Sequence, residues 1–253
     1  MASPYAQTAF RARFDWGLVG AKALVGDVAV VAVVDVLSFT TSLTVAVDNG
    51  IEVFPFRWKD ERAAAFAEAR NAVLAVARST AEPGRISLSP ATIRAAGDIA
   101  RLVLPSPNGS TISHDVAETG VTVIGVSPRN VDAAADWTIR TLADRPDASI
   151  AAIAAGERWS DGSLRPAVED LWGAGSYLAA LAERGFGPLS PEAHSAAAAY
   201  RAVADDFPAR LWASASGQEL IAWGYSDDVE VAVEVNASTS VPVLRGESFT
   251  AAC

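Results

Sequence analysis

Short apolar runs alternate with amphipathic segments along most of this chain. The runs are rich in β-branched residues, which is typical of buried strands, and apolar residues in the segments between them recur at helical spacing. The pattern predicts strands at Phe14–Trp16, Ala29–Val34, Glu52–Phe56, Val73–Ala77, Arg101–Pro105, Thr122–Val126, Ser149–Ala154 and Val241–Leu244. It predicts helices at Thr40–Asp48, Asp60–Asn71, Asp132–Ala143, Ala167–Arg184, Pro191–Asp205, Pro208–Ala222 and Ser226–Glu234.

The segment Ala167–Arg184 is the clearest predicted helix. Its apolar residues form one stripe, Pro166 suits a first helical turn, and Gly185 suits a helix end. Because strands and helices alternate, we predict an α/β protein with a three-layer α/β/α architecture and a mostly parallel or mixed sheet. One domain is expected over residues 1–253, and the Ala-rich residues 190–224 are expected to add a helical layer.

Composition narrows the choice of partners. The 253 residues carry a net charge of −10, which disfavours nucleic acid or an anionic membrane as the partner but leaves room for a small anionic substrate. The single cysteine, Cys253, excludes an internal disulfide and a cysteine-based zinc site. The sequence has no apolar signal-peptide core and no uninterrupted apolar stretch of about eighteen residues. We therefore expect a cytoplasmic protein without a membrane span.

Residues Val30–Gly50 carry the strongest candidate for chemistry. An apolar run ends at Asp35, and the hydroxyl-bearing residues Ser38, Thr40 and Thr41 follow at the start of a predicted helix. Open α/β sheets bind ligands at the carboxyl ends of their strands, and helix N-termini attract anions. A carboxylate beside such an anion site favours metal-assisted phosphate chemistry. The alternative is that the hydroxyls only cap the helix and that Asp35 belongs to an ordinary turn.

Three further polar loops follow predicted strands, so we expect them to meet at one edge of the sheet. Loop Pro105–Ser113 contains an Asn-Gly turn, loop Gly125–Asn130 contains one arginine, and loop Gly156–Asp170 is long for a strand-to-helix connection. Each loop also has a structural interpretation. The Asn-Gly turn can be an ordinary hairpin turn, and Arg129 can form a surface ion pair with Asp132. The carboxylates at the end of the third loop are favoured in a first helical turn by the helix dipole. Loop Pro83–Pro90 is interpreted as an ordinary surface loop.

These loops supply residue types that suit a phosphate site. Mg²⁺ needs only one or two protein carboxylates, so Asp35 with Glu169 or Asp170 is the predicted metal site. Glu157 is the predicted proton-transfer group, and Arg129 is predicted to neutralise charge on the phosphoryl group. The predicted substrate-binding residues are Ser38, Thr40, Thr41, Ser110, Thr111, Arg158 and Arg165.

Several other hydrolase motifs are missing from the sequence. The haloacid-dehalogenase motif needs a second aspartate two residues after the first, and Leu37 occupies that position. Histidine is limited to His114 and His194, and neither lies in an Arg-His-Gly strand end. There is also no Gly-x-Ser-x-Gly elbow, P-loop or dinucleotide-binding fingerprint.

The order of the polar segments resembles that of the 2-phosphosulfolactate phosphatase family. Within residues 28–245 the matching segments are DVLSFTTSLTVAVDNG, PNGST, GVSPRN, GERWSDGSLRPAVEDLWGAG and GYSDDVEVAVEVNASTSVPVL. The resemblance implies a three-layer α/β/α fold and Mg²⁺-dependent hydrolysis of 2-phospho-3-sulfolactate, a step toward coenzyme M. It also implies that Asn108 and Asn130 belong to the site, together with Asp35, Glu169 and Asp170.

The chain departs from the family pattern at Ser38, where the family has an arginine, and at Phe39, where it has an alanine. A multiply charged substrate needs positive charge beyond one metal ion. We therefore predict that Arg158 or Arg165 points into the cleft and replaces the missing arginine. The alternatives are a different substrate, phosphotransfer to an acceptor other than water, or a non-catalytic relative that binds small anions. A homodimer is compatible with the sequence.

Overall fold

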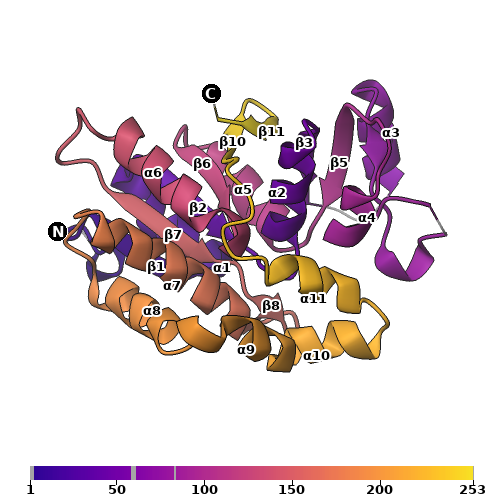
Figure 1. Ribbon diagram of the computed structural model, residues 1–253. Coiled ribbons are helices and arrows are strands. Elements are labelled where there is room, and N and C mark those ends of the chain that lie inside the picture. Colours follow the sequence, from indigo (N-terminus) through magenta and orange to yellow (C-terminus); the bar gives the residue numbers. More distant parts are fainter. Residues whose placement is uncertain (1–2, 58–60, 83, 253) are drawn as a thin grey trace.

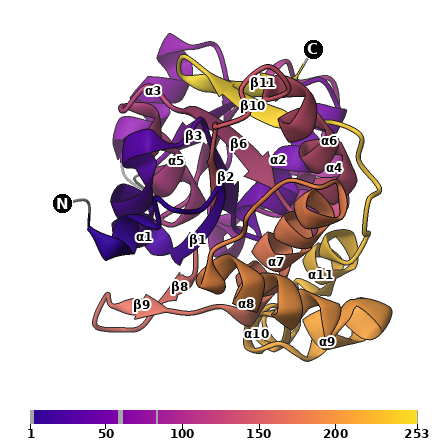
Figure 2. The same ribbon diagram turned by 90° about the vertical axis from the view of Figure 1, so that its left-hand side faces the viewer.

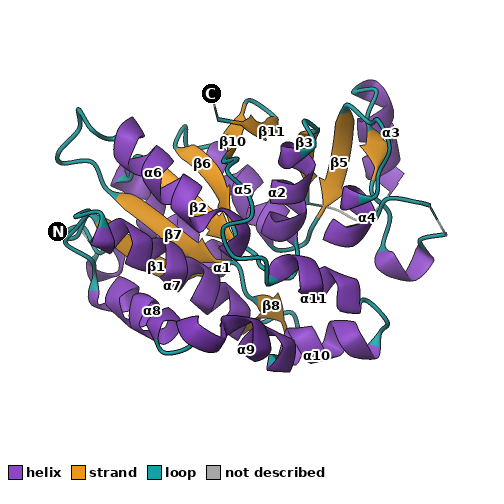
Figure 3. Ribbon diagram, in the orientation of Figure 1, coloured by secondary structure: helices purple, strands orange, loops and turns teal. Residues whose placement is uncertain are grey.

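The computed structural model describes residues 3–57, 61–82 and 84–252, and within them a nine-stranded mixed sheet lies between helices on both faces (Figures 1 and 3). The predicted three-layer α/β/α architecture is confirmed. In this part of the chain no helix combines the length and the apolar character that a membrane crossing requires.

The sheet has the strand order β1-β7-β2-β6-β10-β11-β3-β5-β4. A separate two-stranded hairpin, β8–β9, projects from the body of the molecule (Figure 2). The strands are β1 Ala12–Trp16, β2 Val30–Val34, β3 Glu52–Phe56, β4 Val73–Leu74, β5 Arg101–Pro105, β6 Thr122–Val126, β7 Ile150–Ala154, β8 Glu157–Arg158, β9 Leu164–Arg165, β10 Pro242–Arg245 and β11 Ser248–Ala251.

Two parallel groups of strands make up the sheet, and the hairpin β10–β11 joins them. Strands β1, β7, β2 and β6 are parallel, with Val30 opposite both Ile150 and Thr122, and strands β3, β5 and β4 form the second parallel group. Among the described residues, β10 pairs with β6 through Val243 and Ile124 alone, and β11 pairs with β3 through Phe249 and Val53 alone. Both junctions are antiparallel, so the sheet is mixed.

Helices cover both faces of the sheet. Helices α6, α7 and α8 pack on one face, and α1 and α5 pack on the other (Figure 2). Apolar side chains of α2 belong to the same core as those of α1 and α5. The helices are α1 Gly17–Leu24, α2 Phe39–Asp48, α3 Glu61–Ala69, α4 Pro90–Arg94, α5 Gly109–Ala117, α6 Val131–Thr141, α7 Val168–Glu183, α8 Pro191–Arg201, α9 Phe207–Ala213, α10 Ala215–Ala222 and α11 Ser226–Ala232. Short 3-10 helices are η1 Pro4–Ala6, η2 Val25–Asp27, η3 Arg78–Thr80, η4 Pro128–Asn130 and η5 Ala204–Asp206.

Strand β2 consists entirely of valine and alanine because it is covered on both sides. Val30 and Val34 belong to the core under α6 to α8, whereas Val31 and Val33 belong to the core under α1, α2 and α5. Alternate side chains of a strand point to opposite faces, so a strand between two cores has no polar face. The residues that follow β2 are therefore held rigidly from both sides.

The segment 190–224 forms α8, α9 and α10, and α8 lies against α7. The two helices approach closely at Gly175, where a Cβ atom would lie 2.1 Å from the carbonyl oxygen of Ala196. A glycine is therefore needed at this crossing. That residues 1–253 form one domain stays a prediction.

The structure differs from the predicted elements in several places. The helix predicted at Pro208–Ala222 is divided at Ser214, which adopts extended backbone angles and accepts a hydrogen bond from Gly217 N as the N-cap of α10. The strand predicted at Val73–Ala77 ends at Leu74, and the helix predicted at Pro191–Asp205 ends at Arg201. Helices α1, α4 and α5 and strands β8, β9 and β11 were not predicted.

Candidate active site

Asp35 stands where the two parallel groups of strands meet. It follows β2, and its carboxylate accepts hydrogen bonds from Phe39 N at the start of α2 (3.2 Å) and from Gly109 N at the start of α5 (2.9 Å). Ser106, which follows β5, lies with its hydroxyl 3.4 Å from Asp35 Oδ2. The carboxyl ends of β2 and β5 therefore converge on one carboxylate, and two helix N-termini favour negative charge there.

Asp170 fixes the loops around Asp35. It lies in the first turn of α7, and its two oxygens accept hydrogen bonds from Val36 N (2.7 Å) and Gly156 N (2.8 Å). These two backbone groups follow β2 and β7, which are neighbouring strands. Asp170 thus links the ends of both strands to α7.

Two further acidic residues complete the cluster. Glu169 is buried and accepts a hydrogen bond from Ser216 of α10. Glu157, on β8, accepts a hydrogen bond from Asn108 Nδ2 at 3.0 Å. The predicted residues Asp35, Glu157, Glu169 and Asp170 are therefore brought together, and we call these four residues the carboxylate cluster.

The carboxylate cluster is electrostatically strained. Burial raises the pKa of Asp35, of Glu169 and, most strongly, of Asp170, and the charge of Asp35 raises the pKa of the last two further. Burial and the charge of Asp35 raise the pKa of Glu157 to about 7. Several buried carboxylates that repel one another favour a bound cation.

A divalent cation fits the donor chemistry of the cluster. Carboxylate oxygens are the ligands that Mg²⁺ prefers. Within the described residues no group of three or more acidic, histidine or cysteine side chains has an arrangement that holds a metal ion. One or two protein carboxylates are enough for Mg²⁺ when water and substrate oxygens complete its coordination.

The hydroxyls predicted to bind substrate are mostly used within the fold. Thr40 Oγ1 donates to Asp35 O at 2.8 Å, Thr41 Oγ1 donates to Val36 O at 2.7 Å, and Ser110 Oγ donates to Leu104 O at 2.9 Å. The alternative interpretation, in which these hydroxyls serve only the local turns and helix starts, therefore accounts for these side chains. Thr111 is half-buried in the first turn of α5.

Arg129 and Asn130 of η4 are engaged in structural contacts. Arg129 is buried and forms ion pairs with Glu234 and, at 3.3 Å, with Asp48. Asn130 accepts from Ser127 N and donates to the carbonyl oxygens of Gly125 and Ser240. In the described part of the chain no hydrogen bond or ion pair joins either side chain to the carboxylate cluster, so their predicted roles receive no support from the geometry.

The two arginines predicted to enter the cleft differ in position. Arg158 is exposed and donates to Gly162 O within its own hairpin, so it does not replace the arginine missing at Ser38. Arg165 donates to Ser216 Oγ at 3.2 Å, and its charge acts on Glu157 and Glu169. Arg165 therefore borders the carboxylate cluster.

Arg78 is the functional candidate that sequence reasoning missed. It begins η3, and its Nη2 donates to Ser38 Oγ at 2.6 Å, so a guanidinium contacts the residue that stands where the family pattern has an arginine. Its charge also acts on Asp35. A signal was available, because Arg78 comes directly after the strand predicted at Val73–Ala77, as the other site loops follow strands.

Loop Pro83–Pro90, interpreted as an ordinary surface loop, is exposed at Gly84 and Arg85 but buried further along, and Pro83 lies outside the described residues. Ser87 and Ser89 are buried, and the Ser89 hydroxyl donates to the carboxylate of Asp228, which also pairs with Arg78. The loop therefore helps to hold Arg78 in place.

Comparisons with known proteins point to one family. The sequence model described as 2-phosphosulpholactate phosphatase matches residues 20–247. A Thermus thermophilus protein named probable 2-phosphosulfolactate phosphatase is 34% identical over 225 residues, which cover 86% of this chain and 88% of the relative. A 2-phosphosulfolactate phosphatase from Methanothermobacter thermautotrophicus is 31% identical over 215 residues, which cover 84% of this chain and 85% of the relative.

Proposed function

Because the chain belongs to the 2-phosphosulfolactate phosphatase family, we propose that it is a Mg²⁺-dependent phosphatase of a small acidic phosphate monoester, 2-phospho-3-sulfolactate. This reaction would place it on a route toward coenzyme M. The observation that carries the proposal is the position of Asp35, held between the N-termini of α2 and α5 and surrounded by three other buried or half-buried carboxyl groups. A cytoplasmic location and a homodimer remain part of the proposal.

Asp35 and Glu169 are the proposed ligands of Mg²⁺. Glu169 is favoured over Asp170 because the Asp170 oxygens join the loops after β2 and β7 through Val36 N and Gly156 N, whereas Glu169 accepts from Ser216 and from its own backbone N–H. Asp35 Oδ2 accepts from Gly109 N and the Ser106 hydroxyl, whereas Asp35 Oδ1 accepts only from Phe39 N among the described residues and keeps a lone pair for a cation. When bound, Mg²⁺ would polarise the phosphoryl group and increase the acidity of a bound water molecule.

The protein itself supplies the proton and the positive electrostatic potential around the phosphoryl group. Glu157, with a pKa of about 7, can hold a proton near neutral pH and deliver it to the oxygen of the departing alcohol. Asn108 orients Glu157 through its hydrogen bond. The N-termini of α2 and α5 stabilise negative charge on the phosphoryl oxygens.

The decisive experiment measures phosphate release from a panel of phosphate monoesters with and without Mg²⁺. Release from 2-phospho-3-sulfolactate that depends on Mg²⁺ would support the proposal. Thermal stabilisation by the same esters without release would indicate the non-catalytic binder, and release only with an added acceptor would indicate a phosphotransferase.

We expect the rate to fall as pH rises through about 7. A general acid must be protonated, and Glu157 loses its proton near that pH, so kcat/KM should fall up to tenfold per pH unit above it. Glu157→Gln should remove this alkaline limb and lower the rate by about a hundredfold. A pH–rate profile checks the prediction, and the exposed Glu219→Gln variant is the matched control. A wild-type profile that rises through pH 7 would assign Glu157 to base rather than acid catalysis.

Mg²⁺ is expected to stabilise the fold more at pH 8 than at pH 5. Because these carboxyl pKa values are raised, the folded protein binds more protons than the unfolded chain. The contribution of these groups to folding stability is therefore present at low pH and is lost as pH rises through the raised pKa values. A bound cation offsets this repulsion, and a hundredfold excess over Kd adds about 2.7 kcal/mol. Thermal unfolding with Mg²⁺ or with sodium at equal ionic strength measures the effect. An equal increase in Tm on adding Mg²⁺ at both pH values would contradict this prediction.

A further inference from the structure

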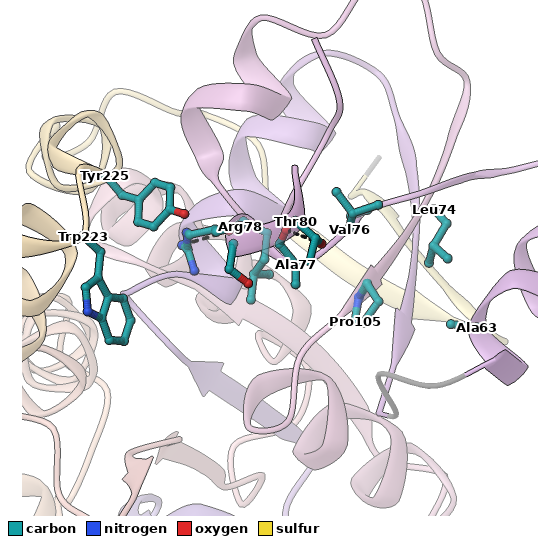
Figure 4. A pocket seen from close by; sticks show the side chains of 12 residues that line it. Ala63, Leu74, Val76, Ala77, Arg78, Thr80, Pro105, Trp223 and Tyr225 are labelled. Carbon is teal, nitrogen blue, oxygen red and sulfur yellow. Dashed lines mark hydrogen bonds between the residues drawn. The ribbon is translucent and has the colours of Figure 1, made fainter. Parts of the chain in front are cut away.

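Arg78, whose charge acts on Asp35, lines a cavity of about 650 Å³, and Figure 4 shows the side chains around it. Its volume is within the range of small-molecule sites. The turn before α11 forms one wall with Trp223 and Tyr225, and the ends of β4 and β5 form the opposite wall (Figure 4). The lining is mainly apolar, with Leu74, Val76, Leu88 and Pro105 among its residues.

Among the described residues that line this cavity, Arg78 is the only one with a charged side chain. Its Nε pairs with Asp228 at 2.7 Å, and its Nη2 donates to Ser38 Oγ and to Leu88 O. Within the described residues no hydrogen bond or ion pair uses its Nη1. The guanidinium is also 5.9 Å from the centre of the Tyr225 ring, so its orientation is fixed while one donor group stays available.

Two residues of the cavity lining connect it to the groups that hold the Asp35 carboxylate. Pro105 lines the cavity and directly precedes Ser106, whose hydroxyl lies beside the Asp35 carboxylate. Ser38, bound to Arg78, directly precedes Phe39, whose N–H group binds the same carboxylate. Arg78 is therefore the cavity residue whose charge also acts on Asp35.

Resting on the function proposed above, we propose that this cavity holds the organic end of the substrate and that Arg78 binds an acidic group on it. The acidic group needs a cation, because the neighbouring carboxylate cluster repels anions. A guanidinium matches the oxygen geometry of a sulfonate or a carboxylate. Asp228 and Ser38 act as positioning residues that hold the guanidinium at the cavity wall.

The test compares charge-matched variants in binding experiments that need no turnover. Removing Arg78 alone would leave Asp228 buried without its partner, so the informative variant is the double change Arg78→Gln with Asp228→Asn. Calorimetry with Mg²⁺ present measures Kd for 3-sulfolactate, for lactate and for inorganic phosphate. We expect the double variant to bind 3-sulfolactate about ten- to a hundredfold more weakly and to bind inorganic phosphate as the wild type does.

Asp228→Asn alone separates the charge of Arg78 from its positioning. It keeps the guanidinium but removes the carboxylate that orients it, so we expect 3-sulfolactate to bind more weakly than to the wild type and more tightly than to the double variant. The surface control is Arg210→Ala, because Arg210 of α9 is exposed and pairs with Asp206 of η5. Lactate, which has a carboxylate and no sulfonate, shows which acidic group Arg78 prefers.

The outcomes separate this inference from the proposed function. Arg78-dependent binding of 3-sulfolactate or lactate, without phosphate release from the phosphorylated compound, would retain the binding role and reject the phosphatase. Phosphate release with a KM that does not change in the double variant would retain the phosphatase and overturn the role of Arg78. Equal weakening of sulfolactate and inorganic phosphate binding would also overturn it, as would failure of the wild type to bind either acid.

Discussion

Asp35→Asn is expected to lower phosphatase activity by about a thousandfold or more. A catalytic metal ion contributes several kcal/mol to transition-state stabilisation, and each 1.36 kcal/mol corresponds to a tenfold change in rate. Asparagine keeps the shape of Asp35 but removes the negative charge that would attract the ion. Phosphate release from 2-phospho-3-sulfolactate with Mg²⁺ measures the effect. A folded variant with wild-type turnover would show that Asp35 has no role in the chemistry.

The same variant should stay folded. Its amide can accept only one of the hydrogen bonds from Phe39 N and Gly109 N, which costs about 1–3 kcal/mol, but losing a buried charge relieves repulsion within the carboxylate cluster. We therefore expect its Tm to stay within several degrees of the wild type, with a smaller response to Mg²⁺. Asp205→Asn, on the exposed η5 segment, is the matched control and should leave both quantities unchanged.

Gly109→Ala is expected to damage both activity and stability. A Cβ atom at this position would lie 2.3 Å from Phe39 Cδ1 and 2.8 Å from Asp35 Oδ2, so the start of α5 must move away from Asp35. Overpacking of this kind costs about 1–3 kcal/mol, and a displacement of about 1 Å at a reaction centre lowers rates about a hundredfold. Denaturant unfolding and steady-state kinetics measure the two effects.

Gly97→Ala is the control for that substitution. No atom lies within 4 Å of a Cβ atom built at Gly97, and its backbone needs no left-handed conformation. This variant should match the wild type in both measurements. If Gly109→Ala also matched the wild type, the close approach of α5 to Asp35 would have no functional importance.

The sequence predicts those elements whose signal is local. Strands Glu52–Phe56, Arg101–Pro105 and Thr122–Val126 have the predicted bounds because apolar runs lie between clear turn residues. Helix α5 was not predicted because it is rich in hydroxyls, yet Ser110 and Ser113 satisfy theirs on the carbonyl oxygens of Leu104 and Gly109. The insertion of β10 and β11 into the middle of the sheet depends on contacts that no local pattern reveals.

The same distinction applies to the candidate site. Asp35, Glu157 and Asp170 can be recognised in the sequence because they lie in segments that follow predicted strands, and such segments form the ligand sites of α/β sheets. The partners of Arg129 are not recognisable, since Asp48 and Glu234 lie 81 and 105 residues away along the chain. Arg78 was missed for a similar reason, because its importance depends on Ser38 and Asp228 in distant segments.

The hairpin β10–β11 also determines the order in which the sheet can be completed. Each parallel group of strands contains only residues that precede residue 155, whereas the pairing that joins them requires residues 242–251. Contacts between residues so far apart in sequence form late, because a long chain segment must first be closed into a loop. On the ribosome, the two groups can therefore assemble while the carboxylate cluster is still incomplete, since Glu169 and Asp170 emerge after β7. Their union must wait for nearly all of this sequence to be synthesised.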